Sequence, residues 1–348
     1  MRINDTQKLT GGNKMKKVVI VGFGNIGKGV LKAIVDFPDM EVVGIITRSR
    51  KRVIEEDQHE GLSVYEIRDL EWQKLDADVA ILCGGSKDDL PVQGPYFQQF
   101  FNTVCSFDTH GHIDNWFNEK GQPQLGYFQM MNAMACTYGH VATVCQGWDP
   151  GIFSVMRAVF KSCLGNCDSF GFYGLGESGG LSMGHSDALR NVVGVKDARQ
   201  YTHAIHETID KLRKGEITSA TKDQMHWREC IVVLEEGADE ESVRETIVNM
   251  PEYFKGIKTT VRFISQEELD EKHQGMFHDG LVLGAAPFGA MEYRNSWDSN
   301  PLATAYILLA YARATIRLSS NGGEGAFTPL DIAPRFLLED EGPNLNLV

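Results

Sequence analysis

The sequence has no apolar run that approaches the roughly 18 residues of a membrane-spanning helix, and no signal peptide is recognisable in it. It also has no excess of basic residues, because 34 Lys and Arg stand against 47 Asp and Glu, for a net charge of −13. Such a chain is a poor partner for nucleic acid or for an anionic membrane. We therefore expect a cytoplasmic protein whose partner is a small molecule.

Cysteine is scarce and odd in number. The seven thiols lie mostly inside apolar segments, at Cys83, Cys105, Cys136, Cys145, Cys163, Cys167 and Cys230. They are typical of reduced core cysteines in a cytosolic protein. The Cys163–Cys167 pair has no second pair of ligands nearby, so the sequence predicts no metal site.

The 348 residues are 42% hydrophobic, with a mean hydropathy of −0.24. At roughly 150 residues per domain, this length predicts two domains with sizeable cores.

A glycine motif follows the first expected strand. The β-branched residues 18–21 lead into Gly22-Phe23-Gly24-Asn25-Ile26-Gly27, and apolar residues then recur at helical spacing. This is the strand, turn and helix of a dinucleotide-binding unit, in which the glycines permit the turn, the approach of a pyrophosphate and close helix packing. The helix N-terminus adds N–H groups for the phosphates. A plain glycine turn is the alternative, but the context favours cofactor binding.

The second expected strand, residues 41–47, ends in Thr47-Arg48-Ser49-Arg50-Lys51-Arg52. An acidic residue at this position binds the ribose of NAD, whereas guanidinium groups suit the additional phosphate of NADP. The alternative is a solvated basic loop. Because the basic run falls at the discriminating position, we predict NADP as the cofactor.

Strands and helices alternate through the first half of the chain. We expect strands at 62–67, 78–85, 103–107 and 141–145, and helices at 91–101 and 113–138. This alternation predicts an α/β fold with a doubly wound, Rossmann-type parallel sheet.

The pattern changes after a tight turn at 146–151. A helix is expected at 152–164, followed by strands at 169–173, 227–234, 258–264 and 289–297 and helices such as 240–250. These predict an inserted α+β domain with a mixed sheet. A helix at 302–318 and a glycine loop at 322–327 then lead to the C-terminal tail.

The expected domain organisation has three parts. Residues 1–14 are expected to be a disordered leader, and residues 15–149 a dinucleotide-binding domain completed by 301–348. Residues 150–300 are expected to form a substrate-binding and dimerisation domain.

Four polar clusters fall, on this interpretation, at strand ends or turns, where ligands collect in open α/β sheets. They are residues 106–110, 147–151, 182–187 and 275–280. Taken singly, Asp108 and Asp149 are typical of turns or caps, and His185 and His278 of structural histidines. As clusters beside a nucleotide domain, they favour a hydride-transfer enzyme, which needs a carboxylate for an amine or hydroxyl proton.

These segments resemble the meso-diaminopimelate D-dehydrogenases, NADP-dependent amino acid dehydrogenases of lysine biosynthesis. The resemblance runs from Met15 to about Leu338. It rests on Val-Gly-Phe-Gly-Asn-Ile-Gly at 21–27, Leu-Cys-Gly-Gly-Ser at 82–86, Ser-Phe-Asp-Thr-His at 106–110, Gly-Trp-Asp-Pro-Gly at 147–151, Gly-His-Ser-Asp-Ala at 184–188, Gln-Tyr-Thr at 200–202, Arg-Glu-Cys at 228–230 and Asn300-Pro301.

The resemblance implies a homodimer that reversibly deaminates the D-centre of meso-2,6-diaminopimelate, giving L-2-amino-6-oxopimelate, ammonia and NADPH. It places Asp108 and Asp149 near the reacting amino group, with Trp148 and Tyr173 as walls. The residues it assigns to the distal L-amino acid end, or beside the substrate, are Met183, Gly184, Asp187, Thr202, Arg228, His278 and Asn300. The candidate cofactor-binding residues beyond the glycine motif are Thr47, Arg48, Ser49, Arg50, Cys83, Gly84, Gly85 and Ser86.

The chemistry of this substrate agrees with these roles. Because its two ends are identical zwitterions, selectivity requires a grip on the distal end, and a forked Arg228 can bind that carboxylate through two hydrogen bonds. Asp149 is then the candidate for accepting the ammonium proton or positioning the water that attacks the imine.

The sequence departs from the family pattern at several points. Many relatives have Gln in place of Met183 and an arginine pair in place of Arg48-Ser49, a role that Arg50 or Lys51 then takes. Relatives often read Met-Pro-His-Gly-Gly where this chain has Met-Phe-His-Asp-Gly at 276–280, and the 176–180 glycine stretch is longer here. These departures resemble the branch of broader specificity, which also aminates 2-oxo acids to D-amino acids.

Two other functions stay open. One is a different NADP-dependent Rossmann oxidoreductase, acting on a semialdehyde or a sugar, which would want a lysine base or a nucleophilic cysteine. The other is a protein that senses NADPH without turnover.

Overall fold

The computed structural model describes residues 15–56, 59, 61–118, 120–165, 167–251, 253–339 and 347. The leader expected over residues 1–14 lies outside this described part. The chain divides into two compact units: unit 1 is Met1–Pro150 with Thr304–Val348, and unit 2 is Gly151–Ala303. Within the described residues, no helix has both the length and the apolar character needed to cross a bilayer.

Unit 1 is built on a seven-stranded parallel sheet in the order β16-β8-β5-β4-β1-β2-β3. The strands are β1 (Lys16–Val21), β2 (Met40–Thr47), β3 (Val64–Glu66), β4 (Val79–Leu82), β5 (Asn102–Cys105), β8 (Val141–Thr143) and β16 (Gly325–Phe327). The chain builds outward from β1 in one direction, then returns to add β4 on its other side. The predicted doubly wound Rossmann-type sheet is therefore confirmed.

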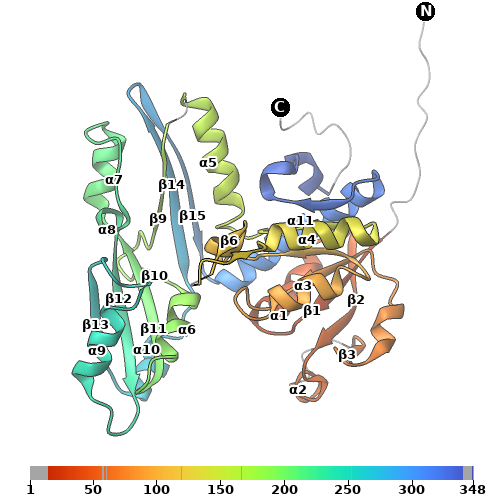
Figure 1. Ribbon diagram of the computed structural model, residues 1–348, viewed down its shortest axis with the longest axis horizontal. Coiled ribbons are helices and arrows are strands. Elements are labelled where there is room, and N and C mark those ends of the chain that lie inside the picture. Colours follow the sequence, from red (N-terminus) through yellow and green to blue (C-terminus); the bar gives the residue numbers. More distant parts are fainter. Residues whose placement is uncertain are drawn as a thin grey trace, which may run out of the picture. The chain divides into compact units, whose positions relative to one another are not determined.

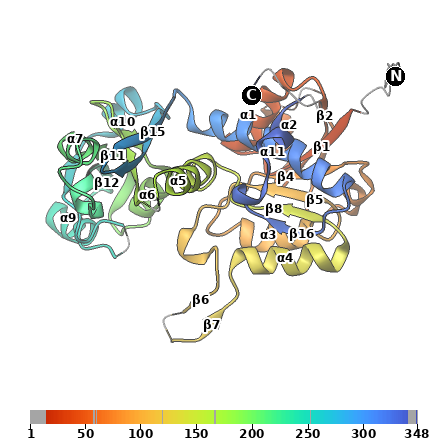
Figure 2. The ribbon, with the colours of Figure 1, turned by 90° about the horizontal axis from the view of Figure 1, so that it is seen from above.

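Helices cover both faces of this sheet (Figure 2). They are α1 (Asn25–Ala33), α2 (Arg50–Glu55), α3 (Leu90–Phe97), α4 (Tyr127–Tyr138) and α11 (Asn300–Ser320), with short 3-10 turns at η1 (Ile34–Asp36), η2 (Leu70–Lys74), η3 (His110–His112), η4 (Pro329–Asp331) and η5 (Pro334–Leu337). Phe97 of α3 and Met131 of α4 share a core cluster with Val144. Thr143 points to the opposite face, where its hydroxyl lies 2.6 Å from that of Thr315 on α11.

A buried ion cluster joins the end of the chain to its beginning. Arg313 of α11 donates two hydrogen bonds to Asp39, at 2.5 and 2.8 Å, and Lys16 donates a third at 3.1 Å. All three side chains are almost fully buried. The cluster holds α11 to the segment before β2, so the C-terminal part of the chain completes unit 1.

The prediction of a single helical region at 113–138 is wrong in its first half. Only α4 is helical there, and it is preceded by a small hairpin of β6 (Trp116–Phe117) and β7 (Pro123–Gln124), which extends away from the sheet of unit 1 (Figure 2). The side-chain oxygen of Asn118 accepts the Gln122 N–H at 3.0 Å. Gly121 has φ +70°, and Pro123 lacks the N–H that a helix interior needs.

The glycine loop predicted at 322–327 also needs correction. Its last three residues form β16, which pairs with β8 at the edge of the sheet. A three-residue strand is specified by its partner rather than by its own sequence, because pairing and burial decide strand preference.

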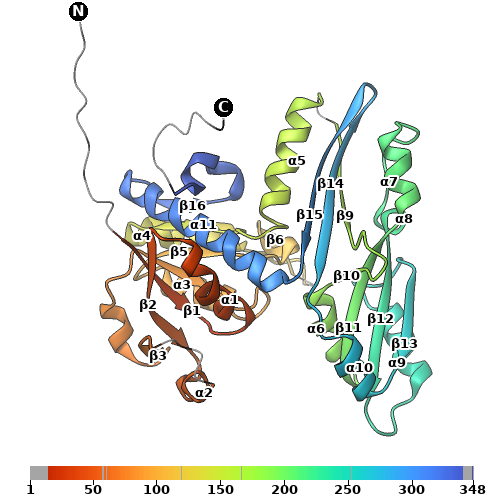
Figure 3. The ribbon, with the colours of Figure 1, turned by 180° about the vertical axis from the view of Figure 1, so that it is seen from behind.

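Unit 2 contains two sheets (Figures 1 and 3). One has the order β10-β11-β12-β13, with β12 and β13 parallel, and the other has the order β15-β14-β9. The strands are β9 (Ser169–Tyr173), β10 (Gly180–Leu181), β11 (Val195–Ala204), β12 (His226–Leu234), β13 (Thr259–Phe263), β14 (His278–Ala286) and β15 (Gly289–Trp297). The predicted mixed sheet is confirmed.

The helices of unit 2 are short apart from the first. They are α5 (Ile152–Cys163), α6 (Met183–Arg190), α7 (His206–Arg213), α8 (Lys222–Met225), α9 (Glu240–Val248) and α10 (Gln266–Lys272). The sequence did not predict β11 or β14. The polar cluster at 182–187, expected at a strand end or turn, instead begins α6, and His278 is the first residue of β14.

Candidate functional site

The glycine turn after β1 leaves room for a ligand at one position only. A Cβ on Gly27 would overlap the Gly22 carbonyl oxygen, and Gly22 has φ +89°. A Cβ on Gly24, in contrast, would meet no atom within 4 Å. In the described part of the chain, no side chain caps the amino end of α1, so its first N–H groups are available to an anion. These residues fit a dinucleotide pyrophosphate.

A second glycine turn follows β4, the strand beside β1 at the point where strand order reverses. The two turns are in contact, because a Cβ on Gly22 would lie 3.4 Å from the Gly84 nitrogen. Asp89 accepts the Gly85 N–H at 3.0 Å and binds the Arg48 guanidinium at 3.0 Å. Asp89 thereby connects the end of β2 to the turn after β4, a link that the sequence did not predict.

The basic run after β2 is partly helical. Ser49 caps α2 by accepting the Arg52 N–H at 3.4 Å, and Thr47 accepts the Ser49 N–H at 3.3 Å. The Arg48 side chain is 75% exposed. Within the described residues, the Arg50 guanidinium has no ion pair. The two guanidinium groups are therefore accessible to a phosphate.

Two carboxyl groups follow neighbouring strands of the sheet. Asp108 comes after β5 and Asp149 after β8, and the two strands are paired. The Asp108 N–H donates to the Ser86 hydroxyl at 3.1 Å, which ties this segment to the turn after β4. Desolvation raises the pKa of Asp108, and the charge of Asp149 adds to that rise against the opposing effects of Ser86 and His110. A raised pKa favours the protonated form of this carboxyl relative to that of an ordinary aspartate.

The three buried cysteines of unit 1 do not offer an activated nucleophile. Burial raises the pKa of Cys83, Cys105 and Cys145, and the mutual proximity of these thiols adds to the rise for Cys83 and Cys145. A thiol with a raised pKa holds little thiolate at neutral pH. This disfavours the semialdehyde oxidoreductase that would need a cysteine nucleophile.

Arg228 is the most unusual side chain of unit 2. It lies on β12 opposite Thr202 of β11, with its guanidinium carbon 5.6 Å from the centre of the Phe254 ring. Its Nε and Nη1 atoms are buried and, among the residues that the structure describes, have no hydrogen-bond partner. Desolvation lowers the pKa of Arg228 to about 10, so the group stays cationic at pH 7. A buried cation with unsatisfied donors is arranged for an anion that the protein does not supply.

Two histidines near Arg228 are held in the neutral form. Burial, and then the charge of Arg228, lower the pKa of His185 to about 3 and that of His226 to about 4. The His185 Nδ1 lies 2.6 Å from the Ser182 hydroxyl, and the His226 Nε2 accepts the Tyr173 N–H at 3.1 Å. Both rings therefore act as neutral packing and hydrogen-bonding groups.

Tyr173 belongs to a row of nearly parallel rings. Its ring centre lies 5.4 Å from His226, 6.2 Å from Phe153 and 6.5 Å from His278. Arg157 donates to the Tyr173 hydroxyl at 3.3 Å. This row forms a rigid aromatic wall in unit 2. Trp148, the other candidate wall, is buried in the turn after β8.

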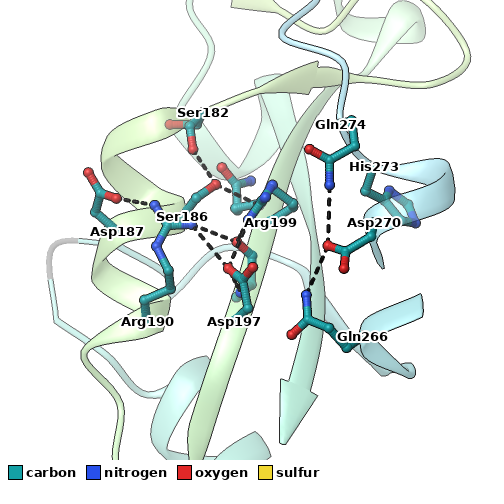
Figure 4. A network of polar contacts seen from close by, with 12 residues as sticks. Ser182, Ser186, Asp187, Arg190, Asp197, Arg199, Gln266, Asp270, His273 and Gln274 are labelled. Carbon is teal, nitrogen blue, oxygen red and sulfur yellow. Dashed lines mark hydrogen bonds and ion pairs between the residues drawn. The ribbon is translucent and has the colours of Figure 1, made fainter. Parts of the chain in front are cut away.

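Helix α6 is fixed to β11 by a polar network (Figure 4). The Ser186 hydroxyl donates to the Ser182 carbonyl at 2.6 Å and accepts the Gln200 N–H at 2.9 Å. Arg190 donates to the Ala198 carbonyl at 2.9 Å and forms an ion pair with Asp187. The network leaves one face of α6 exposed, and that face carries Met183, Gly184 and Asp187.

Asn300 is brought beside the fourth polar cluster. Its N–H donates to the Met276 carbonyl at 3.1 Å, next to a parallel bridge between Met276 and Ser299. The structure thus gathers the candidate substrate residues of unit 2 on α6, β11, β12 and the segment around His278. The aromatic partner Phe254, missed in the sequence, lies in a loop with no motif to mark it.

The chain has close relatives among proteins of known activity. The family model of the diaminopimelic acid dehydrogenase C-terminal domain matches residues 147–296. The meso-diaminopimelate D-dehydrogenase of Ureibacillus thermosphaericus is 44% identical over 332 residues, which cover 94% of this chain and 96% of that protein. The enzyme of the same name from Corynebacterium glutamicum is 39% identical over 329 residues, which cover 93% of this chain and 96% of that protein.

The chain belongs to the meso-diaminopimelate D-dehydrogenase family. Enzymes of this name are oxidoreductases that act on a CH–NH2 group. The family predicted from the sequence is therefore confirmed.

Solved structures agree with this assignment. The C. glutamicum diaminopimelate dehydrogenase in complex with diaminopimelate has a TM-score of 0.83 and 37% identity, covering 94% of this chain and 97% of that one. An engineered D-amino acid dehydrogenase bound to NADP+ has a TM-score of 0.80 and 36% identity, covering 95% and 97%. Members of the meso-diaminopimelate D-dehydrogenase family thus share this fold over nearly their full length.

Proposed function

We propose that this family member reversibly deaminates the D-centre of meso-2,6-diaminopimelate, giving L-2-amino-6-oxopimelate, ammonia and NADPH, and so serves lysine biosynthesis. The observation that carries the proposal is the pair of buried, unsatisfied donors on Arg228. A carboxylate supplies two acceptors in the planar arrangement that a guanidinium matches. The distal carboxylate of a diamino diacid meets this need.

We assign binding of the distal end to unit 2. Arg228 would bind the distal carboxylate, and the exposed carboxylate of Asp187 would accept from the distal ammonium in competition with Arg190. Thr202, His278 and Asn300 would complete this end, and Met183 and Gly184 would lie beside the substrate. Trp148 and Tyr173 would wall the reacting end. Fixing the distal end selects which of the two identical amino acid groups reacts.

We assign proton transfer to the two carboxyl groups of unit 1. Asp149 would accept the ammonium proton or position the attacking water, and Asp108, with its raised pKa, would buffer that proton.

We assign cofactor binding to the two glycine turns and the basic run of unit 1. Gly22, Gly24, Asn25, Ile26 and Gly27 would hold the pyrophosphate, Cys83, Gly84, Gly85 and Ser86 would line the turn after β4, and Thr47, Arg48, Ser49 and Arg50 would bind the ribose phosphate. NADP, when bound, supplies the hydride acceptor. A Michaelis constant for NAD as low as that for NADP would contradict this assignment.

We also propose a broader substrate range, a homodimer and a cytoplasmic location. The departures at Met183 and in the glycine stretch support amination of 2-oxo acids to D-amino acids. The family resemblance supports a homodimer, and a light-scattering mass near the 38.7 kDa of one chain would contradict it. The seven free thiols are typical of a reducing compartment, and export to an oxidising one would contradict the location.

The Arg228→Met variant tests whether Arg228 binds the distal carboxylate of the substrate. We expect kcat/KM for meso-diaminopimelate to fall at least about 100-fold, because losing one partner of a buried charge pair costs roughly 2–5 kcal/mol. D-Alanine has no distal end, so its kcat/KM should change by less than about threefold. Arg244→Met is the matched control, because Arg244 also lies over an aromatic ring, Phe263, at 4.9 Å. Equal losses of kcat/KM on both substrates would refute the assignment of Arg228 to the distal carboxylate.

Asp149→Asn tests the proton-transfer role. We expect kcat to fall by about 100-fold or more, the usual contribution of a general base, while NADP still binds with its original dissociation constant. Turnover and NADP titration by fluorescence measure the two quantities. A fully active variant would remove Asp149 from the mechanism.

A further inference from the structure

We propose that Asp279 is a positioning residue for substrate selectivity, which locks the glycine-rich loop at 174–180 against Thr202 and His278. The proposal rests on the function proposed above, in which those two residues bind the distal end of the substrate. Asp279 itself lies inside β14 and has no role among the residues assigned so far.

The Asp279 carboxylate is buried and is satisfied by the loop. The residue is 2% exposed. One carboxylate oxygen accepts the Leu175 N–H at 2.8 Å, and the other accepts the Gly176 N–H at 3.2 Å. Within the described residues, no cation pairs with Asp279. A buried carboxylate without partners is strongly unfavourable, so the loop amides and Asp279 stabilise one another.

The backbone of the anchored loop packs directly on the candidate substrate residues. Gly174 has φ +69°, and a Cβ there would overlap the Thr202 carbonyl oxygen. A Cβ on Gly180 would lie 2.8 Å from the His278 Nδ1, and Gly180 pairs with Thr202 in the β10–β11 ladder. Because the loop backbone packs tightly against Thr202 and His278, it holds these two residues in place on that side, and a displaced loop leaves them without this support.

The loop also packs closely on unit 2 near its other end, at Gly179. Gly179 has φ +70°, and a Cβ on it would lie 2.7 Å from the His203 ring, which stacks at 3.9 Å on Trp227. Asp279 therefore fixes one end of a segment whose other end rests on a rigid ring pair. Its loss frees the first end beside Thr202 and His278, whereas Tyr173, the reacting-end wall that precedes the loop, keeps its pairing with Gly280 in the β14–β9 ladder.

Asp279→Ala and Asp279→Asn test the proposal in the full-length enzyme. Asn keeps the shape and one acceptor, so it should behave between Ala and wild type. We expect the Ala variant to raise KM for meso-diaminopimelate about tenfold, the cost of unsatisfied buried amides, while kcat falls less than about threefold. The inhibition constant of L-2-aminopimelate should rise in parallel, because this compound has the distal end but no reacting amino group. The KM for NADP should stay within about twofold.

Asp239→Asn is the matched control, because Asp239 also accepts a backbone N–H in unit 2, that of Ser242 at 2.7 Å. It should leave all these constants unchanged. Hydrogen exchange at Leu175 and Gly176 reports on the anchor itself and should speed up at least about tenfold in the Ala variant.

The measurements distinguish failure of the Asp279 proposal from failure of the proposed function. Faster exchange with unchanged KM and inhibition constant would overturn the link between loop and selectivity. Equal losses of diaminopimelate and NADP affinity would also overturn it, since they indicate general destabilisation; the Asn variant gives the same comparison if Ala does not fold. A wild-type enzyme that does not oxidise meso-diaminopimelate would instead reject the proposed function, in the same assay.

Discussion

At the scale of single residues, the buried cation Arg228 of unit 2 lies near two histidines that are neutral. The protein places the Arg228 cation there and holds the neighbouring imidazoles of His185 and His226 neutral. A second cation beside Arg228 would repel it and compete for the same anion. The neutral histidines thus leave the unsatisfied donors of Arg228 as the recognition feature.

This arrangement predicts a stability that depends on pH. In the folded protein the pKa is about 3 for His185 and about 4 for His226, below the ordinary 6.5. The unfolded chain therefore binds more protons below pH 6.5, and stability falls as the pH falls through that value toward 4. Each histidine should remove about 1.4 kcal/mol of unfolding free energy between pH 7.5 and pH 5.5.

Urea unfolding of wild type and His185→Gln at the two pH values measures this effect. The variant should lose about 1.4 kcal/mol less than wild type over the interval, whereas His112→Gln, a change at an exposed histidine, should match wild type. An identical pH dependence in His185→Gln and wild type would show that His185 is not held neutral by the fold.

At the scale of elements, glycine serves two purposes in the β1–α1 unit: Gly27 permits close packing, and Gly24 leaves space for a ligand. Gly27→Ala should prevent normal packing, because its Cβ would overlap the Gly22 carbonyl oxygen, whereas Gly24→Ala meets only open space. We expect Gly24→Ala to keep its unfolding midpoint within about 2 °C, since Gly→Ala in an unstrained conformation is neutral or mildly stabilising. It should nevertheless weaken NADP binding about tenfold or more, because the added methyl group occupies the pyrophosphate approach.

Thermal unfolding and NADP titration of both variants make the comparison. Gly61→Ala is unsuitable as a control because Gly61 has φ +78°, but Gly111, which has no atom near its Cβ position, is suitable. Unchanged NADP affinity in Gly24→Ala would remove the turn from the cofactor site.

Elements whose signals are local could be predicted from the sequence. The β-branched run of β1, the glycine turn and α1 are adjacent in the chain, and β15 was predicted to its exact bounds. The errors have two causes. β16 depends on distant pairing, because it forms where β8 offers an edge. The β6–β7 hairpin depends on local residues, because Pro123 and Gly121 oppose the helix that apolar spacing favours.

The candidate site also has residues that could be predicted from the sequence and residues that could not. The glycines, the basic run and Arg228 could be proposed from sequence, since motif and residue type mark them. The partners that position them could not be predicted. They are Phe254, which contacts Arg228, Asp89, which contacts Arg48, and Asp279, which contacts the glycine loop. Each is 26 to 104 residues from its contact in the sequence, and no motif marks the pairing. Such pairings depend on how the sheets bring distant segments together.

At the scale of the whole molecule, each unit has its own core and its own set of candidate ligand residues. Unit 1 is assembled from both ends of the chain, and the Arg313–Asp39 contact joins them within its core. The proposed function assigns NADP to unit 1 and the distal end of the substrate to unit 2. The two ligands should therefore protect different parts of the chain.

Hydrogen exchange measures this protection. At 100 times its dissociation constant, a ligand stabilises the state that binds it by about 2.7 kcal/mol, which slows exchange through ligand-releasing openings about 100-fold. NADP alone should slow amides at 22–27 and 84–89 in unit 1. L-2-Aminopimelate, added to the NADP complex, should slow amides at 182–187 and 226–230 in unit 2. Protection by NADP confined to unit 2, or none at the α6 and β12 amides with the inhibitor, would contradict the division of ligands between the units, because binding must stabilise the backbone that carries its contacts.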